Sequence, residues 1–322
     1  MRVLIVRTSS LGDLVHMLPA ITDISRNVPG VQIDWVAEEA FAEIPSWHPA
    51  VGEVIRVAHR RWRKSWWSKQ SRQQRQKVVE RIRQGNYDMV LDMQALLKSV
   101  WLTRAASGVK HGLDWSSARE PLCSLFYDVK HQIGFWQPAV KRQRDLAAAA
   151  FGYQVQGEPD FGLQKTFSHT IRYPEYAVIM PSASREDKLW PSERWQGVFD
   201  RLQQRGLELV LLAGSDQEAE RASALIASRT NARVQPRSSL TELAHLMAGA
   251  RVMVGLDSGL THLAAALGTD TIGLYKASTP IRTPVTGPGK TFSLGDRGRE
   301  PSLESVLQSL NQVFEDRQDV LR

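Results

Sequence analysis

Short runs of apolar and β-branched residues alternate along the chain with longer stretches in which apolar residues recur at helical spacing. This alternation is typical of α/β proteins built on parallel sheets. In the first half, the pattern predicts strands at Val3–Val6, Val31–Ala37, Val54–Val57 and Met89–Asp92. The helices predicted there are Leu14–Asn27 with an interruption at Pro19, Gln73–Arg83, Leu96–Ala106 and Ala139–Phe151.

A second series of the same kind follows residue 175. Its predicted strands are Tyr176–Met180, Leu207–Ala213, Ala232–Gln235, Val252–Leu256 and Thr271–Tyr275. Its predicted helices are Glu193–Arg205, Gln217–Ser228, Leu240–Ala248, Leu260–Leu267 and Ser302–Phe314.

Between the two series, residues 152–174 lose their periodicity and hold glycines, prolines and isolated aromatic side chains, as a linker does. The pattern therefore predicts two successive α/β domains with a cleft between them. Ligands of such sheets bind at the carboxyl ends of the strands, so the loops after the strands are where chemistry is expected.

Composition agrees with a packed protein of this size. The chain has 322 residues, of which 42% are hydrophobic and 23% charged, enough for two ordinary domains. Its one cysteine, Cys123, excludes an intrachain disulfide and a cysteine-rich metal cluster, which fits a reducing cytoplasm. No apolar run approaches the ~18–20 residues that span a bilayer, and the apolar run at the start is too short for a secretion signal. We expect a protein that is soluble or bound to a surface.

Positive charge is concentrated in the first half of the chain. Residues 1–165 hold 23 basic and 16 acidic side chains, whereas residues 166–322 hold 18 of each. Between Arg60 and Arg83 there are ten basic residues and one acidic residue, together with Trp62, Trp66 and Trp67. Tryptophan and clustered basic residues favour anionic lipid head groups. A solvated helix face and a stacking surface for nucleic acid are the alternatives, but no nucleic-acid-binding motif is present.

The first strand leads into Thr8-Ser9-Ser10-Leu11-Gly12-Asp13, a turn of small residues before a helix. Such a turn lets a ligand approach the backbone closely. Asp13 is predicted to lie near the helix N-terminus. It serves there either as an ordinary N-cap or as a carboxylate general base.

A second group of candidates follows the strands of the second half. The strand Val252–Leu256 delivers Asp257-Ser258-Gly259-Leu260-Thr261-His262 to a helix start, where backbone N–H groups and the helix dipole favour a phosphate. Lys188 and Glu218 also follow strand ends and suit a diphosphate and ribose hydroxyls. The alternatives are a solvated lysine, an acidic residue favoured by the helix dipole, and an ordinary helix histidine at His262.

Two common nucleotide motifs are missing. The dinucleotide fingerprint G-x-G-x-x-G is absent, which argues against a nicotinamide dehydrogenase. Gly287-Pro288-Gly289-Lys290-Thr291 resembles the end of a P-loop, but the first glycine of that motif is replaced by Pro284. No strand leads directly into the segment either, so we reject a P-loop.

The two loops resemble signatures of one family. The segments Thr8–Asp13, with His16-Met17-Leu18-Pro19-Ala20 after it, and Asp257–His262 are similar to motifs of bacterial lipopolysaccharide heptosyltransferases. Further segments resemble the branch that adds the first heptose: Pro45–His48, Arg60–Lys64, Asp114-Trp115, Ala118–Pro121 and Asp187–Pro191. The resemblance extends over nearly the whole chain.

The resemblance implies a glycosyltransferase-B fold, in which two Rossmann-like α/β domains face each other across a cleft. It implies an acceptor-binding domain over residues 1–165 and a nucleotide-sugar-binding domain over residues 166–300. The closing segment, residues 301–322, is expected to hold a helix that packs back on the first domain.

The implied activity is inverting transfer of L-glycero-D-manno-heptose from ADP-L-glycero-β-D-manno-heptose to the Kdo of Kdo2-lipid A. The implied location is the cytoplasmic face of the inner membrane, with peripheral attachment to its anionic surface. No dinucleotide cofactor, catalytic metal or nucleic-acid partner is expected, and the protein is expected to be a monomer.

Site roles follow position by position from the resemblance. Asp13 matches the general base, and Lys188 matches a residue that stabilises the charge of the departing diphosphate. The donor-site positions are Ser184, Lys188, Glu218, Asp257, Ser258, Gly259 and His262. The acceptor-site positions are Ser10, Gly12, Arg60, Arg61, Arg63, Lys64, Lys98 and Arg119. Family members often carry threonine where this chain has Ser184 and Ser258, and both serines retain the hydroxyl.

Two other functions stay open at this point. The nearest is addition of the second heptose, or a related transfer from another nucleotide sugar. A different class is a non-catalytic protein that binds anionic lipid or nucleic acid through the basic segment alone, which leaves the donor motif unexplained.

Overall fold

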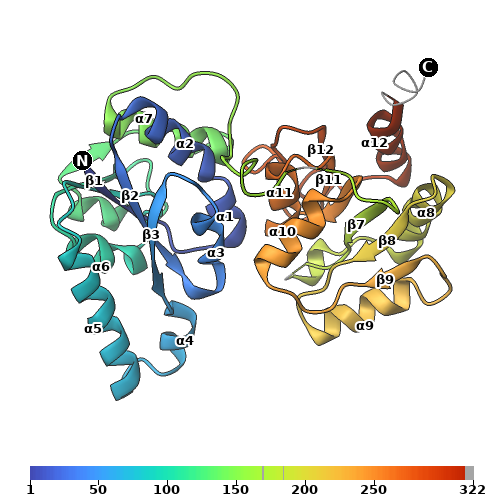
Figure 1. Ribbon diagram of the computed structural model, residues 1–322, viewed down its shortest axis with the longest axis horizontal. Helices are drawn as coiled ribbons and strands as arrows, with labels where there is room; N and C mark the ends of the chain where they lie inside the picture. The colour runs from blue at the N-terminus through green and yellow to red at the C-terminus, as the bar shows by residue number, and fades with distance from the viewer. Residues whose placement is uncertain (169, 184, 316–322) are drawn as a thin grey trace. The chain divides into compact units, whose positions relative to one another are not determined.

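The computed structural model describes residues 1–168, 170–183 and 185–315. Its contacts divide the chain into two compact units, Met1–Gly162 and Leu163–Arg322, so that the division falls inside the expected linker. Figure 1 shows that each unit is a sheet covered by helices on both faces.

The first unit contains a six-stranded sheet. Its strands are β1 (Arg2–Val6), β2 (Gln32–Glu38), β3 (Val51–Val57), β4 (Met89–Asp92), β5 (Val109–Leu113) and β6 (Val129–His131). Its helices are α1 (Leu11–Val15), α2 (Leu18–Asn27), α3 (Glu43–Ser46), α4 (His59–Lys64), α5 (Lys69–Gln84), α6 (Leu97–Ala105) and α7 (Ala139–Phe151), with the short 3-10 helices η1 (Glu39–Phe41) and η2 (Pro121–Phe126). The strand order is β3-β2-β1-β4-β5-β6, and all neighbours are parallel.

The second unit repeats this arrangement over the residues that are described. Its strands are β7 (Tyr176–Met180), β8 (Glu208–Leu211), β9 (Ala232–Val234), β10 (Val252–Leu256), β11 (Thr271–Tyr275) and β12 (Thr291–Gly295). Its helices are η3 (Glu186–Lys188), α8 (Ser192–Gln204), α9 (Asp216–Leu225), α10 (Leu240–Ala248), α11 (Gly259–Ala266) and α12 (Leu303–Glu315). The order β12-β11-β10-β7-β8-β9 is again parallel throughout, so each unit is Rossmann-like and the predicted α/β class is confirmed.

The predicted helix at Leu14–Asn27 is two helices. Helix α1 ends at Val15, and α2 begins at Leu18 with Pro19 in its first turn. Proline is tolerated there because the first N–H groups of a helix have no partner within the helix. The chain therefore turns between the two helices where the sequence pattern showed only an interruption.

Three strands were not predicted. β5, β6 and β12 carry polar or half-buried residues at most positions and lie toward or at the sheet edges. Edge strands bury only part of their surface, so their apolar pattern is weak.

Trp62 is a core residue, which corrects the interpretation of the basic, tryptophan-rich segment. Its side chain is buried beside Trp101 and His59, with the Trp62 and Trp101 ring centroids 6.4 Å apart. Its indole N–H donates to Gln74 over 2.8 Å. Only Trp66 and Trp67, at 40% and 83% exposure, remain for contact with a partner.

The closing helix packs on the second unit, where we expected it to pack on the first domain. The apolar face of α12 enters the core of the second sheet through Val306, Leu310, Val313 and Phe314. Helix α8 supplies Phe199 and Leu202 to the same core. The correction follows from the helical spacing of these four apolar residues, which need one continuous buried surface.

Candidate active site

In both sheets, the chain reverses its direction of growth between two neighbouring central strands. These pairs are β1 with β4 in the first unit and β7 with β10 in the second. At such a reversal the loops that leave the carboxyl ends diverge and open a crevice for a ligand. The candidate loops of Asp13, Lys188 and Asp257 follow β1, β7 and β10, whereas the loop before Glu218 follows β8 and the basic helix α4 follows β3.

Asp13 lies in the first turn of α1, three residues after the N-cap residue, Ser10. One of its carboxylate oxygens accepts hydrogen bonds from the N–H and hydroxyl of Ser10, both at 2.8 Å. The other oxygen pairs with the Arg7 guanidinium at 2.7 Å. Asp13 is therefore not the N-cap itself, as one interpretation had it, but it does anchor the helix start. The Asp13 side chain is nevertheless 39% exposed.

The pKa of Asp13 is depressed. Burial alone would raise this pKa, but the charge of Arg7 and the hydrogen bonds from Ser10 outweigh it and lower the pKa to about 2. The carboxylate is thus ionised at neutral pH.

Arg7 and Gln94 hold the loop of residues 7–10 and were missed in the sequence. Gln94 accepts hydrogen bonds from the N–H and hydroxyl of Thr8 at 2.9 and 2.7 Å. Lys98, from the start of α6, donates to the Ser9 hydroxyl over 2.6 Å. These contacts join residues more than 80 positions apart, so no local pattern announces them.

Asp92 organises the neighbouring loop from the end of β4. It is fully buried and accepts hydrogen bonds from the N–H groups of Gln94 and Ala95, and from the hydroxyls of Ser99 and Tyr127. Complete burial raises the pKa of Asp92, although each of these hydrogen bonds acts to lower it. The carboxylate fixes Gln94 and hence the Asp13 loop.

Glu38 connects the Asp13 loop to the basic helix α4. Its N–H donates to the Thr8 carbonyl, and its carboxylate accepts from the N–H groups of His59 and Arg60, all at 3.0 Å. The N-cap position of α4 is Ala58, which has no side-chain acceptor. Glu38, itself buried, therefore caps α4 from the end of β2.

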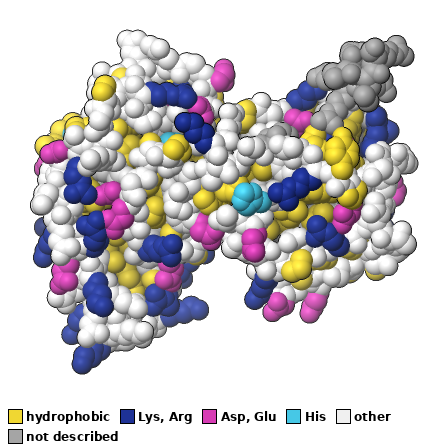
Figure 2. Space-filling view, viewed as in Figure 1, with side chains coloured by type: hydrophobic (Ala, Val, Ile, Leu, Met, Phe, Trp, Pro, Cys, Tyr) yellow, Lys and Arg dark blue, Asp and Glu magenta, His cyan; other side chains and the backbone are white. Residues whose placement is uncertain are grey.

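The predicted acceptor residues of α4 differ in their surroundings. The Arg61 guanidinium forms a two-bond ion pair with Glu39 at 2.9 and 3.1 Å, and Arg60 stacks on the Phe41 ring. Arg63 and Lys64 are exposed without a partner among the described residues. Arg119 is exposed on a different loop. Lys and Arg side chains gather over α4 and α5 at the lower end of the first unit (Figure 2).

In the second unit, Asp257 is the centre of the candidate site. Its carboxylate accepts from Lys188 Nζ at 2.8 Å and from the Ser278 hydroxyl at 2.6 Å, and it contacts His262 Nε2 at 3.2 Å. Burial alone would raise the pKa of Asp257, but these three partners hold it well below its usual range. The structure thus brings together the predicted residues Lys188, Asp257 and His262. Ser278 belongs to the same cluster and was not predicted.

The start of α11 lies directly beyond Asp257. Ser258 is the N-cap, with its hydroxyl accepting from the Thr261 N–H at 3.3 Å, and Gly259 is the first residue of the helix. The first-turn N–H groups present a positive dipole end to any anion bound there. Ser184 falls outside the described residues.

Glu218 forms part of a helix cap beside a cavity. One of its carboxylate oxygens accepts from the Gly214 N–H at 2.7 Å, in the first turn of α9. Gly214 borders a cavity of about 420 Å³ that reaches the ends of β8 and β9 and Leu260 of α11. Residues 235–238 form one wall of this cavity, and the sequence analysis did not predict them as part of a site.

Neither a metal cluster nor a membrane span is found in the parts of the chain that are described. No group of three or more His, Cys, Asp or Glu side chains is placed to hold a metal ion there. Over the same residues, no helix is long and apolar enough to cross a bilayer.

Comparison with known proteins identifies the family. Residues 75–311 match the model of glycosyltransferase family 9 (heptosyltransferase). The chain belongs to this family. It is 46% identical over 284 residues to lipopolysaccharide heptosyltransferase 1 of Escherichia coli strain K12, which covers 87% of this chain and 89% of the relative.

Two solved structures of the E. coli heptosyltransferase WaaC are similar to this member of the family. The structure with ADP has a TM-score of 0.91 at 42% identity and covers 97% of this chain and 100% of that chain. The structure with ADP-2-deoxy-2-fluoro heptose has a TM-score of 0.87 at 42% identity and covers 98% and 99%. The protein is therefore a glycosyltransferase with the glycosyltransferase-B fold, as the sequence predicted.

Replacing Arg7 tests the electrostatics of Asp13. In Arg7→Gln, we expect the pKa of Asp13 to rise from about 2 toward the ordinary value of about 4, because the paired charge is lost. The pKa of Asp13 is lower in the folded protein than in the unfolded chain, so the ion pair stabilises the folded state at pH values above the ordinary pKa of aspartate. This stabilisation is lost as the pH falls toward 2. Carboxyl carbon NMR titration measures the shift.

The matched control is Arg26→Gln, which removes an arginine paired with Asp160 in the same unit. The pKa of Asp13 should not change in this variant. A pKa of Asp13 that stayed near 2 in Arg7→Gln would contradict the assigned cause.

Proposed function

We propose that this protein transfers L-glycero-D-manno-heptose from ADP-L-glycero-β-D-manno-heptose to the Kdo of Kdo2-lipid A. The observation that carries the proposal is the Lys188–Asp257–His262 cluster at the N-terminus of α11, beside the cavity at Gly214. The similar E. coli proteins, solved with ADP and with an ADP-heptose analogue, support the same donor.

The cavity is suited to the nucleoside of the donor. It is bordered by apolar side chains such as Leu243 and Leu260 and by the backbone of Gly214, and Glu218 follows on α9. An apolar pocket with a few polar groups is typical of a nucleotide site. The other carboxylate oxygen of Glu218 accepts no hydrogen bond from the described residues and is proposed to bind the ribose hydroxyls. The diphosphate is then placed at the start of α11.

The developing charge of ADP is met by groups of the protein. Lys188 is a half-buried cation beside the start of α11, and the first N–H groups of that helix add the positive end of its dipole. Ser258 and Gly259 let the diphosphate approach the backbone closely. This arrangement takes the role that a divalent cation has in other transferases.

On the acceptor side, Asp13 is the proposed general base. The Kdo hydroxyl loses its proton to the Asp13 carboxylate as its oxygen bonds to the anomeric carbon of heptose. The bond from that carbon to the β-phosphate oxygen breaks on the opposite side, which inverts the configuration and releases ADP. Ser10 and Gly12 lie at the start of α1 beside Asp13, and Lys98 of α6 contacts the same loop through the Ser9 hydroxyl. All three are proposed to hold the acceptor.

The exposed cations of the first unit are proposed to bind the acidic groups of the acceptor. Arg63 and Lys64 are exposed and have no competing partner in the part of the chain that the structure describes, and Arg119 is likewise exposed. Arg61 has to exchange its bonds to Glu39 for the ligand, so we rank it below Arg63 and Lys64.

A surface around η2 is proposed as the contact with the anionic cytoplasmic face of the inner membrane. Leu122 and Leu125 are 52% and 64% exposed there, with Phe126 next to them. Arg119 is exposed beside them and has no ion pair among the described residues, and the Arg104 guanidinium lies 5.5 Å from the centroid of the Phe126 ring, so cations flank this apolar surface. Apolar side chains beside free cations match an anionic lipid surface.

Asp13→Asn tests the general base. We expect the transfer rate to fall by about 10²–10⁴-fold while ADP binding is unchanged, because the amide cannot accept the proton. A transfer assay with ADP-heptose and Kdo2-lipid A, together with calorimetry for ADP, measures both. Asp200→Asn, which changes an exposed carboxylate of α8, is the control.

Full activity of Asp13→Asn would remove Asp13 from its assigned role. Linkage analysis of the wild-type product decides between the first and the second heptose. A product formed only from an acceptor that already carries heptose would overturn the proposed acceptor.

The double variant Arg63→Gln with Lys64→Gln tests acceptor binding. We expect the KM for Kdo2-lipid A to rise about 5–30-fold, since each cation near an anionic lipid contributes about 1 kcal/mol. The Kd for ADP should not change. Lys141→Gln with Lys165→Gln makes the same change of charge elsewhere, and an equal rise of KM in that control would indicate a general charge effect.

Leu122→Ser with Leu125→Ser tests the membrane contact. Binding to vesicles of zwitterionic and anionic lipids should weaken about tenfold or more, because two apolar side chains no longer enter the bilayer. Turnover of a de-acylated, soluble acceptor should be unchanged. Tyr173→Ser with Ile281→Ser, two side chains that are 80% and 61% exposed in the second unit, is the control. Equal vesicle binding by both variants would refute the contact.

A further inference from the structure

The loop between β4 and α6, residues 93–96, leaves the sheet beside the Asp13 loop, because β4 is the neighbour of β1. Ala95 in this loop has a φ of +51°, a left-handed conformation that is unfavourable for a residue with a Cβ atom. The loop keeps this conformation because the buried Asp92 carboxylate accepts from the N–H groups of Gln94 and Ala95, at 2.9 and 3.0 Å. Strained backbone that the surrounding contacts impose is found most often at functional sites.

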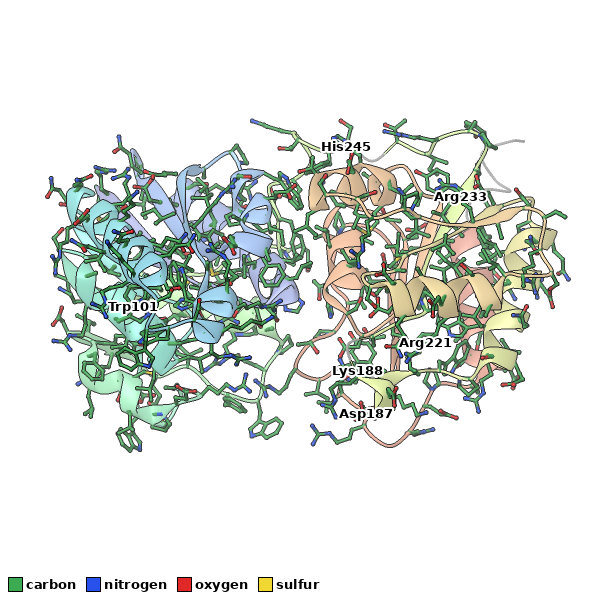
Figure 3. The ribbon with its side chains drawn as sticks, turned by 90° about the horizontal axis from the view of Figure 1, so that it is seen from below. Trp101, Asp187, Lys188, Arg221, Arg233 and His245 are labelled. Carbon is green, nitrogen blue, oxygen red and sulfur yellow. The ribbon has the colours of Figure 1, made fainter. Side chains whose placement is uncertain are left out.

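The second oxygen of Asp92 is held by hydroxyl groups. They belong to Ser99, Thr103 and Tyr127 and donate over 2.8, 3.1 and 2.9 Å. Ser99 and Thr103 come from α6, the helix that bears Trp101 in Figure 3. A buried carboxylate is tolerated only when hydrogen bonds compensate for the lost water, and here they also fix the backbone of the loop.

Gln94 connects this loop to the segment that carries Asp13. Its side chain is 6% exposed, and its oxygen accepts from the N–H and hydroxyl of Thr8 at 2.9 and 2.7 Å. Its nitrogen donates to the carbonyl and hydroxyl of Ser9 at 3.4 and 3.3 Å. Thr8 is fully buried, so without Gln94 its N–H and hydroxyl lose their acceptor. The residue after Ser9 is Ser10, which donates two hydrogen bonds to Asp13.

From these contacts we propose that Gln94 is a positioning residue of the transfer reaction, which places the Asp13 carboxylate beside the acceptor hydroxyl by holding residues 8–10. The inference rests on the proposed function, since it takes Asp13 as the general base. The two partners of that carboxylate, Arg7 and Ser10, belong to the segment of residues 7–10, so the carboxylate follows the segment when it moves. A displacement of about 1 Å at a reacting group can lower a rate about 100-fold.

Gln94→Met tests this role, because methionine has a similar length but no amide group. We expect kcat to fall about 10–100-fold, while the KM for Kdo2-lipid A and the Kd for ADP stay within about threefold of the wild type. Gln94→Glu keeps the oxygen that accepts from Thr8 and should recover most of the lost rate. Gln84→Met, which changes an exposed glutamine at the end of α5, should leave kcat unchanged.

Two further measurements separate positioning from a general loss of structure. In the Asp13→Asn background, Gln94→Met should lower kcat less than about threefold, since both changes remove the same contribution. With Asp13 present, carboxyl carbon NMR should show that Gln94→Met raises the pKa of Asp13 above its wild-type value of about 2, because the bonds from Ser10 loosen. The NMR result does not depend on transfer, so it remains informative if Asp13→Asn is fully active and the proposed function loses its base.

A kcat of Gln94→Met within about threefold of the wild type would overturn the proposal. So would equal losses in the wild-type and Asp13→Asn backgrounds, or a pKa of Asp13 that does not change. If Gln94→Met shows no cooperative thermal transition, Thr8→Val takes its place, because it removes a single hydrogen bond to Gln94. Its kcat should fall about three- to tenfold, and an unchanged kcat would again overturn the proposal.

Discussion

The strand order of the two sheets is the constraint on which the rest of the structure depends. In each unit the chain starts at a central strand, builds outward to one edge, and returns to build toward the other. Parallel strands all end at one edge of the sheet, so the loops after β1 and β4, or after β7 and β10, diverge from adjacent points. Asp13, Gln94, Lys188 and Asp257 are functional candidates because they follow these four strands.

The sequence was sufficient where a local pattern carries the information. The central strands are continuous apolar runs, and the loops of Asp13 and Asp257 combine small residues with a helix start, so both could be predicted. Arg7 and Glu38 could not, because their partners come from other strands and helices. Trp62 misled for a related reason: whether a tryptophan lies in a core or on a surface depends on which face of α4 meets the sheet.

Asp257 shows how the second unit keeps its cations in place before any ligand arrives. A lysine beside the start of α11 would otherwise be solvated and mobile. Bonds from Lys188, His262 and Ser278 to one buried carboxylate fix the ammonium near the helix dipole. A donor therefore meets a charge arrangement that needs little reorganisation, which is the source of electrostatic stabilisation in a dry site.

Glu38 has a consequence for how this chain can diverge. Because Ala58 cannot cap α4, the position of the basic helix is set by an acid twenty residues earlier, whose backbone also holds the Asp13 loop. A lineage that loses Glu38 leaves two part-buried N–H groups without a side-chain acceptor unless residue 58 becomes serine, threonine or aspartate. Positions 38 and 58 are thus expected to change together among descendants of this sequence, with the cap transferred from the strand to the helix.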